Sequence, residues 1–327
     1  MRIRSTTAPT SAVPSAPRPR SRRVVAALAL AGGLASAAVL AVPVAASAQD
    51  AAVVVASASA DQAAAAAHWT PAARAAALAA DAPSVAGSAS VSGSSRSATL
   101  SASDDASAAS GAPVPHPDEP FVGVLFYVSG GRNHACTASV VDTPSGDTIA
   151  TAAHCLADRR TGAATRLATF IPGAQGASAP HGIWPVRVAA VSSAWTATGR
   201  ASDDAGFARV SGPAGEVLAA SVGAAEPVFG SALVPATGQA PDLAVLGYPT
   251  AGSATASLEA CEGRPQHDTG GQTSLPCTLG TGAAGSPVLT FTGEQHAVVA
   301  RPSAGRGVLL ASWGADAERA FSSLQGR

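Results

Sequence analysis

The stretch Thr151–Cys155, with the sequence Thr-Ala-Ala-His-Cys, decides the fold of this 327-residue chain. The apolar run Thr148–Ala152 leads into it and predicts a β-strand that ends just before His154. Cys136 lies upstream, and a disulfide from it to Cys155 would close a loop that fixes the backbone of the histidine. A rigid mount suits a general base, because the imidazole must stay within hydrogen-bond reach of its partner.

The chain has four cysteines, which allow two disulfides in three possible pairings. They are Cys136, Cys155, Cys261 and Cys277. A zinc site is the alternative, but the spacings contain no Cys-x-x-Cys pair. The sequence therefore predicts two disulfides, no metal site and no cofactor.

Residues 1–48 have the layout of an export signal. Four arginines between positions 18 and 23 precede an apolar, Ala-rich run over residues 24–42. Ala46-Ser47-Ala48 then fits the small-x-small cleavage pattern, so the mature chain is expected to start at Gln49 and to be secreted. A membrane anchor is the alternative, because the apolar run is long enough to span a bilayer.

The charge balance argues against an anionic partner. All 20 basic residues are arginines, and six of them precede residue 24, where there are no acids. The rest of the chain has 14 basic and 21 acidic residues, a net charge of −7. This excess of acids does not favour binding to nucleic acid or, once the signal is removed, to a membrane.

Residues 49–115 are dominated by Ala, Ser and Pro and predict a propeptide or linker that is mostly disordered, because they offer little apolar surface to bury. One short helix is expected within them over residues 66–80, with Thr70 as its cap and Pro71 in its first turn. Residues 116–327 are long enough to form a folded domain with its own core.

Short apolar runs separated by Gly, Pro, Asp and Ser predict an all-β barrel or sandwich in this domain. The expected strands lie at 121–129, 135–141, 148–152, 186–191, 206–210, 243–247, 286–291 and 297–300. The segment 315–325 predicts a C-terminal helix, since its apolar residues recur at helical spacing. Those residues are Ala317, Ala320, Phe321 and Leu324.

Two further segments could act together with His154. Asp204 directly precedes an apolar strand and could orient an imidazole, whereas Asp203 would cap the loop; the alternative is that both are loop acids. The turn Gly282–Pro287 is rich in glycine, so its backbone N–H groups could converge into an oxyanion hole.

These blocks resemble the trypsin- and chymotrypsin-like serine peptidases, and most closely their secreted actinobacterial and glutamyl-endopeptidase-like branch. The similarity spans about residues 120–327. It also includes the segments Cys136–Val141, Ile149–Cys155, Phe170–Gly173, Gly182–Val186, Gly247–Pro249 and, in the pro-region, Trp69–Pro71. The resemblance implies two six-stranded β-barrels with a peptide or protein ligand in the cleft between them. It also implies catalytic roles for His154 and Asp204 and an oxyanion hole at Gly282 and Ala284.

The sequence departs from that family at the nucleophile. The family's Gly-x-Ser-Gly turn places the nucleophilic serine at Ala284, and a methyl group cannot attack a carbonyl. Ser286 could replace it only by a shift of register that puts Pro287 where a glycine belongs. The sequence therefore predicts an inactive secreted homologue that retains a peptide-binding cleft. The alternatives are an active secreted serine endopeptidase and a cell-surface structural or interaction protein.

Overall fold

The computed structural model describes residues 53–56, 59–80, 111–117, 119–212, 215–250, 256–303 and 307–326. These ranges belong to one compact unit, Ser47–Arg327. The predicted export signal, residues 1–48, lies outside the described residues. Among the described helices, none is long and apolar enough to cross a membrane.

The first half of the domain is a closed β-barrel. Its strands hydrogen-bond in the order β7-β6-β3-β4-β5-β8, and β8 pairs again with β7 to close the ring. All of these pairings are antiparallel. The six strands are β3 (Val122–Ser129), β4 (Arg132–Val140), β5 (Thr148–Ala152), β6 (Arg166–Pro172), β7 (Trp184–Val191) and β8 (Ala205–Val210).

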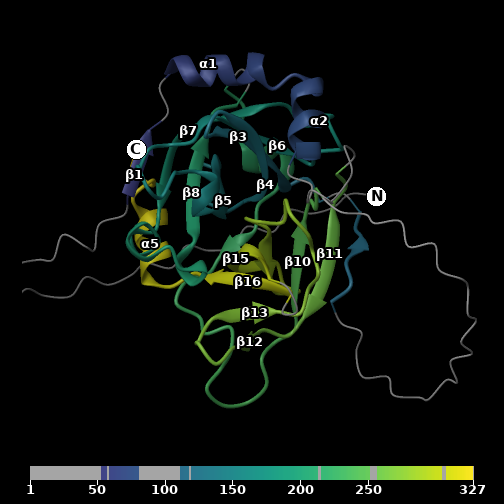
Figure 1. Ribbon diagram of the computed structural model, residues 1–327, viewed down its shortest axis with the longest axis vertical. Coiled ribbons are helices and arrows are strands. Elements are labelled where there is room, and N and C mark those ends of the chain that lie inside the picture. The colour runs from purple at the N-terminus through teal and green to yellow at the C-terminus, as the bar shows by residue number, and fades with distance from the viewer. Residues whose placement is uncertain are drawn as a thin grey trace, which may run out of the picture. The chain divides into compact units, whose positions relative to one another are not determined.

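The second half is a nine-stranded sheet that forms a half-barrel. The strands follow the order β12-β13-β16-β15-β14-β10-β11-β2, and β9 pairs with β15. Figure 1 shows it in green and yellow below the teal barrel. Its strands are β2 (Val114–Pro115), β9 (Glu226–Pro227), β10 (Leu243–Gly247), β11 (Glu259–Gly263), β12 (Gln266–His267), β13 (Thr273–Leu275), β14 (Pro287–Leu289), β15 (Glu294–Ser303) and β16 (Gly307–Ser312).

The helices are short. They are α1 (Ser59–His68), α2 (Pro71–Ala80), α3 (Ser193–Thr198), α4 (Leu218–Val222), α5 (Ala315–Ser322) and the 3₁₀ turns η1 (Ala153–Cys155) and η2 (Ala201–Asp203). The predicted C-terminal helix is confirmed as α5. Ala317 and Ala320 on α5, and Leu324 after it, pack with Phe207 and Trp313 in one apolar cluster.

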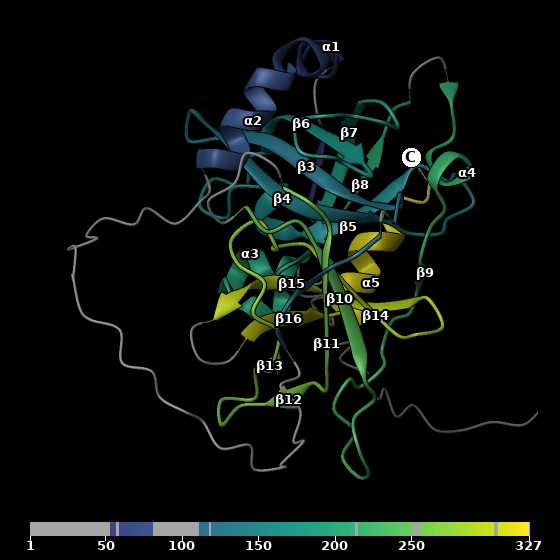
Figure 2. The same ribbon diagram turned by 90° about the vertical axis from the view of Figure 1, so that its right-hand side faces the viewer.

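The N-terminal segment Val53–Ala80 packs against the barrel. Strand β1 (Val53–Ala56) pairs with β7. Helices α1 and α2 lie over the barrel on the side away from the half-barrel (Figures 1 and 2). Between them, Trp69 is fully buried, packs against Phe126 with the two rings tilted by 37°, and donates a hydrogen bond from Nε1 to the Leu167 carbonyl at 2.6 Å.

This cover explains why β3 is apolar along almost its whole length. Leu125 and Tyr127 point into the barrel, where they belong to the interior cluster. Val124 and Phe126 point outward, where they pack with Trp69 beneath the two helices. Side chains alternate between the faces of a strand, so an uninterrupted apolar run is expected only where both faces are covered.

Polar contacts join the barrel to the half-barrel. The Ser139 hydroxyl on β4 donates to Gln295 Oε1 on β15 at 2.9 Å, and both residues are fully buried. The Thr137 hydroxyl, also on β4, donates to the carbonyl of Gly282 at 2.9 Å. Buried polar groups are costly unless they are hydrogen-bonded, so these contacts favour one alignment of the two halves.

Candidate active site

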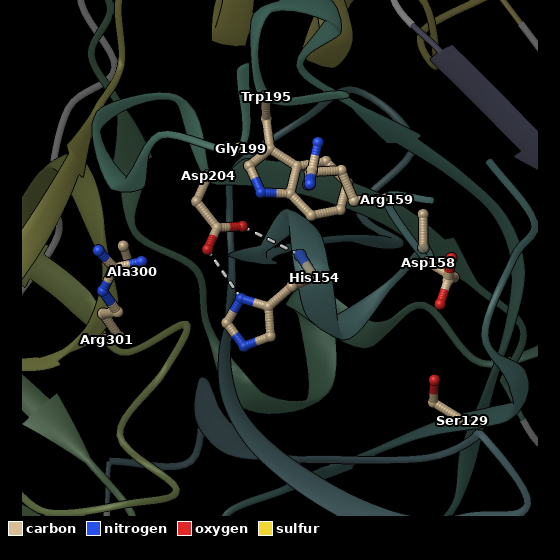
Figure 3. Close-up of a pocket in the computed structure, with 10 residues that line it drawn as sticks. Ser129, His154, Asp158, Arg159, Trp195, Gly199, Asp204, Ala300 and Arg301 are labelled. Atoms are coloured by element: carbon tan, nitrogen blue, oxygen red, sulfur yellow. Dashed lines mark hydrogen bonds and ion pairs between the residues drawn. The ribbon is translucent and has the colours of Figure 1, made fainter. Parts of the chain in front are cut away.

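The histidine and the aspartate predicted from the sequence lie side by side. Strands β5 and β8 pair with Ala152 opposite Ala205, so the residues just after β5 and just before β8 meet at the same end of the barrel. His154 Nδ1 lies 2.8 Å from Asp204 Oδ2, and the His154 backbone N–H donates to Asp204 Oδ1 at 3.0 Å (Figure 3). The backbone N–H of Ala153 also donates to the Asp204 carbonyl at 3.1 Å.

This contact determines which nitrogen of the neutral imidazole carries the proton. A carboxylate can only accept a hydrogen bond, so Nδ1 carries the proton and Nε2 is the basic nitrogen of the neutral ring. Asp203 does not share the role. Its carboxylate accepts hydrogen bonds from the hydroxyls of Thr198, at the end of α3, and of Ser202, in η2.

The pKa of His154 lies above its usual value. Burial lowers this pKa, but the negative charge of Asp204 and its hydrogen bond favour the protonated ring and outweigh burial. The positive charge of Arg301 also acts to lower the pKa. The His154 side chain is still 39% exposed, so a ligand can reach the ring.

The backbone of the turn at Gly282–Ser286 has a form in which N–H groups can donate hydrogen bonds to one anion, and we call this turn the donor cradle. Gly282 and Gly285 both have positive φ angles, +88° and +84°. The N–H groups of Ala283, Gly285 and Ser286 donate to backbone carbonyls. Among the described residues, no acceptor is found for the N–H groups of Gly282 and Ala284, the two that the resemblance assigns to an oxyanion hole. The turn therefore keeps two unengaged donors, as an anion cradle requires.

The turn is docked against the strands that carry the histidine. The carbonyl of Ala284 accepts from the Thr137 N–H at 2.8 Å. At Gly285 the fit is too close for any side chain, because a Cβ would lie 2.1 Å from both the Thr137 carbonyl oxygen and Thr151 Oγ1. Thr137 lies next to Cys136, and Thr151 lies three residues before His154, so the turn packs on the two strands that lead to the histidine.

Ser286 does not take part in this arrangement. It is fully buried, and its hydroxyl has no hydrogen-bond partner among the described residues. The hydroxyl packs on Gly247, where an added Cβ would lie 2.2 Å from Ser286 Oγ. In the part of the chain that the structure describes, no hydroxyl is hydrogen-bonded to the His154 imidazole.

Both predicted disulfides form. Cys136 pairs with Cys155 across a Cα–Cα distance of 6.4 Å, and Cys261 pairs with Cys277 across 5.7 Å. The first joins β4 to η1 and holds the histidine-bearing turn against the barrel. Cys136 and Cys155 lie near the imidazole of His154, but their sulfur atoms are bonded to each other and offer no thiolate to a metal.

A pocket of about 450 Å³ opens beside the histidine, and we call it the His154 pocket. It lies where the barrel meets strand β15, and Figure 3 shows its lining. The lining residues are Ser129, His154, Ala157, Asp158, Arg159, Trp195, Gly199, Asp204, Ala300 and Arg301.

Comparison with solved structures identifies the fold. The protease Anisep from Arthrobacter nicotinovorans aligns with a TM-score of 0.58 and 22% identity, over 66% of this chain and 100% of that one. A thermostable serine protease, AL20, from an extremophilic microorganism aligns at 0.57 and 24%, over 64% and 98%. A Glu endopeptidase aligns at 0.52 and 16%, over 67% and 99%. No protein-family model and no curated protein matches the sequence.

The predicted fold class is therefore confirmed, since the chain has the chymotrypsin-like fold of these serine proteases. The structure brings His154 and Asp204 together and docks the Gly282–Ser286 turn on Thr137 and Thr151, while the catalytic roles assigned to these residues stay predictions. Sequence reasoning missed Arg159 and Trp195 as lining residues. Neither belongs to a motif, and only the folded barrel brings them beside His154.

Proposed function

We propose that this chain, built on the chymotrypsin-like fold of serine proteases, is an exported serine-peptidase homologue that has lost peptidase activity. It keeps the base, the orienting acid and the donor cradle, and it binds peptides at the His154 pocket. The observation that carries the proposal is the alanine at position 284, where the turn pattern of the resembling peptidases has the nucleophilic serine.

The proposed loss of peptidase activity follows from the missing serine hydroxyl. In a working site the histidine removes the proton of a serine hydroxyl as the oxygen attacks the carbonyl carbon of the substrate. Ala284 has no such proton and no lone pair, so His154 has nothing to activate and no acyl-enzyme can form. Loss of the serine from such a triad costs on the order of a million-fold in turnover.

The retained parts favour binding rather than a barrel kept only for stability. The unengaged N–H groups of Gly282 and Ala284 could donate hydrogen bonds to a peptide carbonyl, and the His154 pocket is large enough for a side chain. The predicted signal over residues 1–48 and the two disulfides support export into an oxidising compartment.

A fluorophosphonate probe tests the loss of activity on the native protein. An activated serine displaces fluoride from the phosphorus of the probe and becomes covalently labelled. We expect no labelling of the folded protein under conditions that label an active serine protease to completion. Stoichiometric labelling of the native protein, with the site found by peptide mass spectrometry, would overturn the proposal. Ser129, which lines the pocket, and Ser286 are the serines to inspect first.

A further inference from the structure

Two arginines from different parts of the fold border the His154 pocket. Arg159 belongs to the barrel, in the turn that follows η1, and Arg301 lies on β15 of the half-barrel. In Figure 3 they lie on opposite sides of the His154–Asp204 pair. The pocket is thus flanked by positive charge at both of its walls.

The side chain of Arg159 is exposed and packs on Gly199 of the barrel. Its guanidinium end packs on Gly199, where an added Cβ would lie 2.9 Å from Nε, 3.1 Å from Cδ and 3.2 Å from Cζ. Gly199 caps α3 with a left-handed backbone, φ 67°, which suits glycine. The glycine thus leaves the space that the side chain of Arg159 fills at the edge of the pocket.

Neither arginine has an acidic partner among the described residues. Other arginines of the chain do: Arg187 and Arg209 both bind Asp147, and Arg264 binds Asp242. Arg159 and Arg301, by contrast, are both exposed at the pocket, and the positive charge of Arg301 acts to lower the pKa of His154. Unpaired guanidinium groups in a pocket are available to a ligand.

The acids of the pocket are already engaged. Asp204 accepts from the ring and the backbone of His154. Asp158 accepts from the backbone N–H and the hydroxyl of Thr161, at 2.8 and 3.0 Å. The carboxylates of the pocket are therefore satisfied within the protein, whereas its guanidinium groups are not.

We infer that the His154 pocket selects peptides with an acidic side chain, whose carboxylate binds between Arg159 and Arg301. The inference rests on the proposed peptide-binding function and names the chemistry of the ligand. A guanidinium presents its N–H donors in a planar fork that matches the two oxygens of a carboxylate. Two forks from opposite walls would hold that group more selectively than one exposed cation.

The test compares matched peptides on the native protein. Each fluorescein-labelled octapeptide has an Ala/Gly background with a single Glu, and the set places this Glu at every position of the peptide. Each peptide has a matched partner with Gln at the same position. We expect at least one position at which Glu lowers the dissociation constant by about tenfold in fluorescence anisotropy at low salt. The preference should shrink at 0.5 M NaCl, because salt screens exposed charges.

Variants assign the preference to the two arginines. Arg301→Gln and Arg159→Gln should each reduce the Glu-over-Gln ratio severalfold, and Arg301→Lys should retain part of it because the charge remains. Arg264→Gln is the matched control, since this exposed arginine lies outside the pocket lining, and it should leave the ratio unchanged. Circular dichroism confirms that each variant folds like the native protein.

The possible outcomes separate the two proposals. Equal affinity for every Glu and Gln pair overturns the acidic preference but leaves peptide binding standing. A Glu preference that survives both Gln variants also overturns the inference, because the carboxylate is then recognised elsewhere. If no peptide of either series binds, the proposed function fails and this inference fails with it.

Discussion

The side chain of His154 holds a proton more tightly than an ordinary histidine because Asp204 faces its Nδ1. The ion pair therefore stabilises the folded protein most at pH values below the unfolded pKa of about 6.5. This stabilisation is lost as the pH rises through the higher folded value. The contribution of His154 to the free energy of unfolding should thus be constant at acidic pH and should decrease as the pH rises from about 6.5 through the folded pKa.

Removal of the acid should reverse the shift. In Asp204→Asn the attraction disappears while burial remains, so the pKa of His154 should fall below that of the native protein. In Arg301→Gln the repulsion disappears and the pKa should rise. NMR titration of the His154 Cε1–H resonance measures both. An unchanged pKa in Asp204→Asn would show that the ion pair does not exist in solution.

Local sequence was enough to find the residues of this pair. His154 stands beside a cysteine after an apolar strand, and Asp204 directly precedes another. Arg159, one of the two arginines of the pocket, could not be found in this way. The charge of Arg159 has no pattern around it in sequence, and its place beside Gly199 is a product of tertiary packing.

At the level of elements, the decisive feature is the turn Gly282–Ser286. The turn docks on β4 through a hydrogen bond from the Thr137 N–H to the Ala284 carbonyl and leaves room for no side chain at Gly285. The glycines of this turn were recognisable in the sequence, but the strand against which they dock was not. That contact joins β4 to a segment about 145 residues further along the chain.

Gly285→Ala tests how tightly this turn is docked. Gly293 is the matched control, because it also has a positive φ, +91°, but an added Cβ would meet nothing within 4 Å. Gly293→Ala should cost on the order of 1 kcal/mol of unfolding free energy, from backbone strain alone. Gly285→Ala should cost severalfold more, as measured by chemical denaturation. Equal costs would mean that the turn is not packed on Thr137 and Thr151.

The strands follow the predictions from apolar runs closely, because those runs face a buried core. β5 and β10 match their predicted bounds, and β8 begins one residue early. The strands β6, β11, β13 and β16 were not among the expected runs. β13 has only three residues, and β11 carries two glutamates, so neither presents the alternating or continuous apolar pattern on which such predictions depend.

At the scale of the whole molecule, the N-terminal segment is part of the domain. The sequence predicted a propeptide or linker over residues 49–115 with a short helix at 66–80. The structure places a helix at Pro71–Ala80, preceded by α1, and packs both on the barrel. This docking depends on residues of the barrel that lie far along the chain, so composition alone could not reveal it. Whether the segment is removed on maturation stays a prediction.

Trp69→Ala measures how much this segment contributes to stability. The indole is fully buried and hydrogen-bonded to Leu167, so its loss should cost about 3–5 kcal/mol of unfolding free energy. Phe291→Ala is the control, because that aromatic ring is 65% exposed, and it should change stability by less than about 0.5 kcal/mol. Chemical denaturation of residues 49–327 gives both values. If the two costs are alike, the segment is not docked in solution.

The central claim is that the chain retains a peptidase site in which only the nucleophile is missing. Its most direct test is kcat/KM of Ala284→Ser on a set of chromogenic peptides, beside the native protein and Ala284→Gly, which alters the same position without adding a hydroxyl. Ala284→Ser should gain at least about a thousandfold over both, because His154, Asp204 and the turn are already in place. If Ala284→Ser is no more active than Ala284→Gly, the site is not a peptidase site that lacks only its serine.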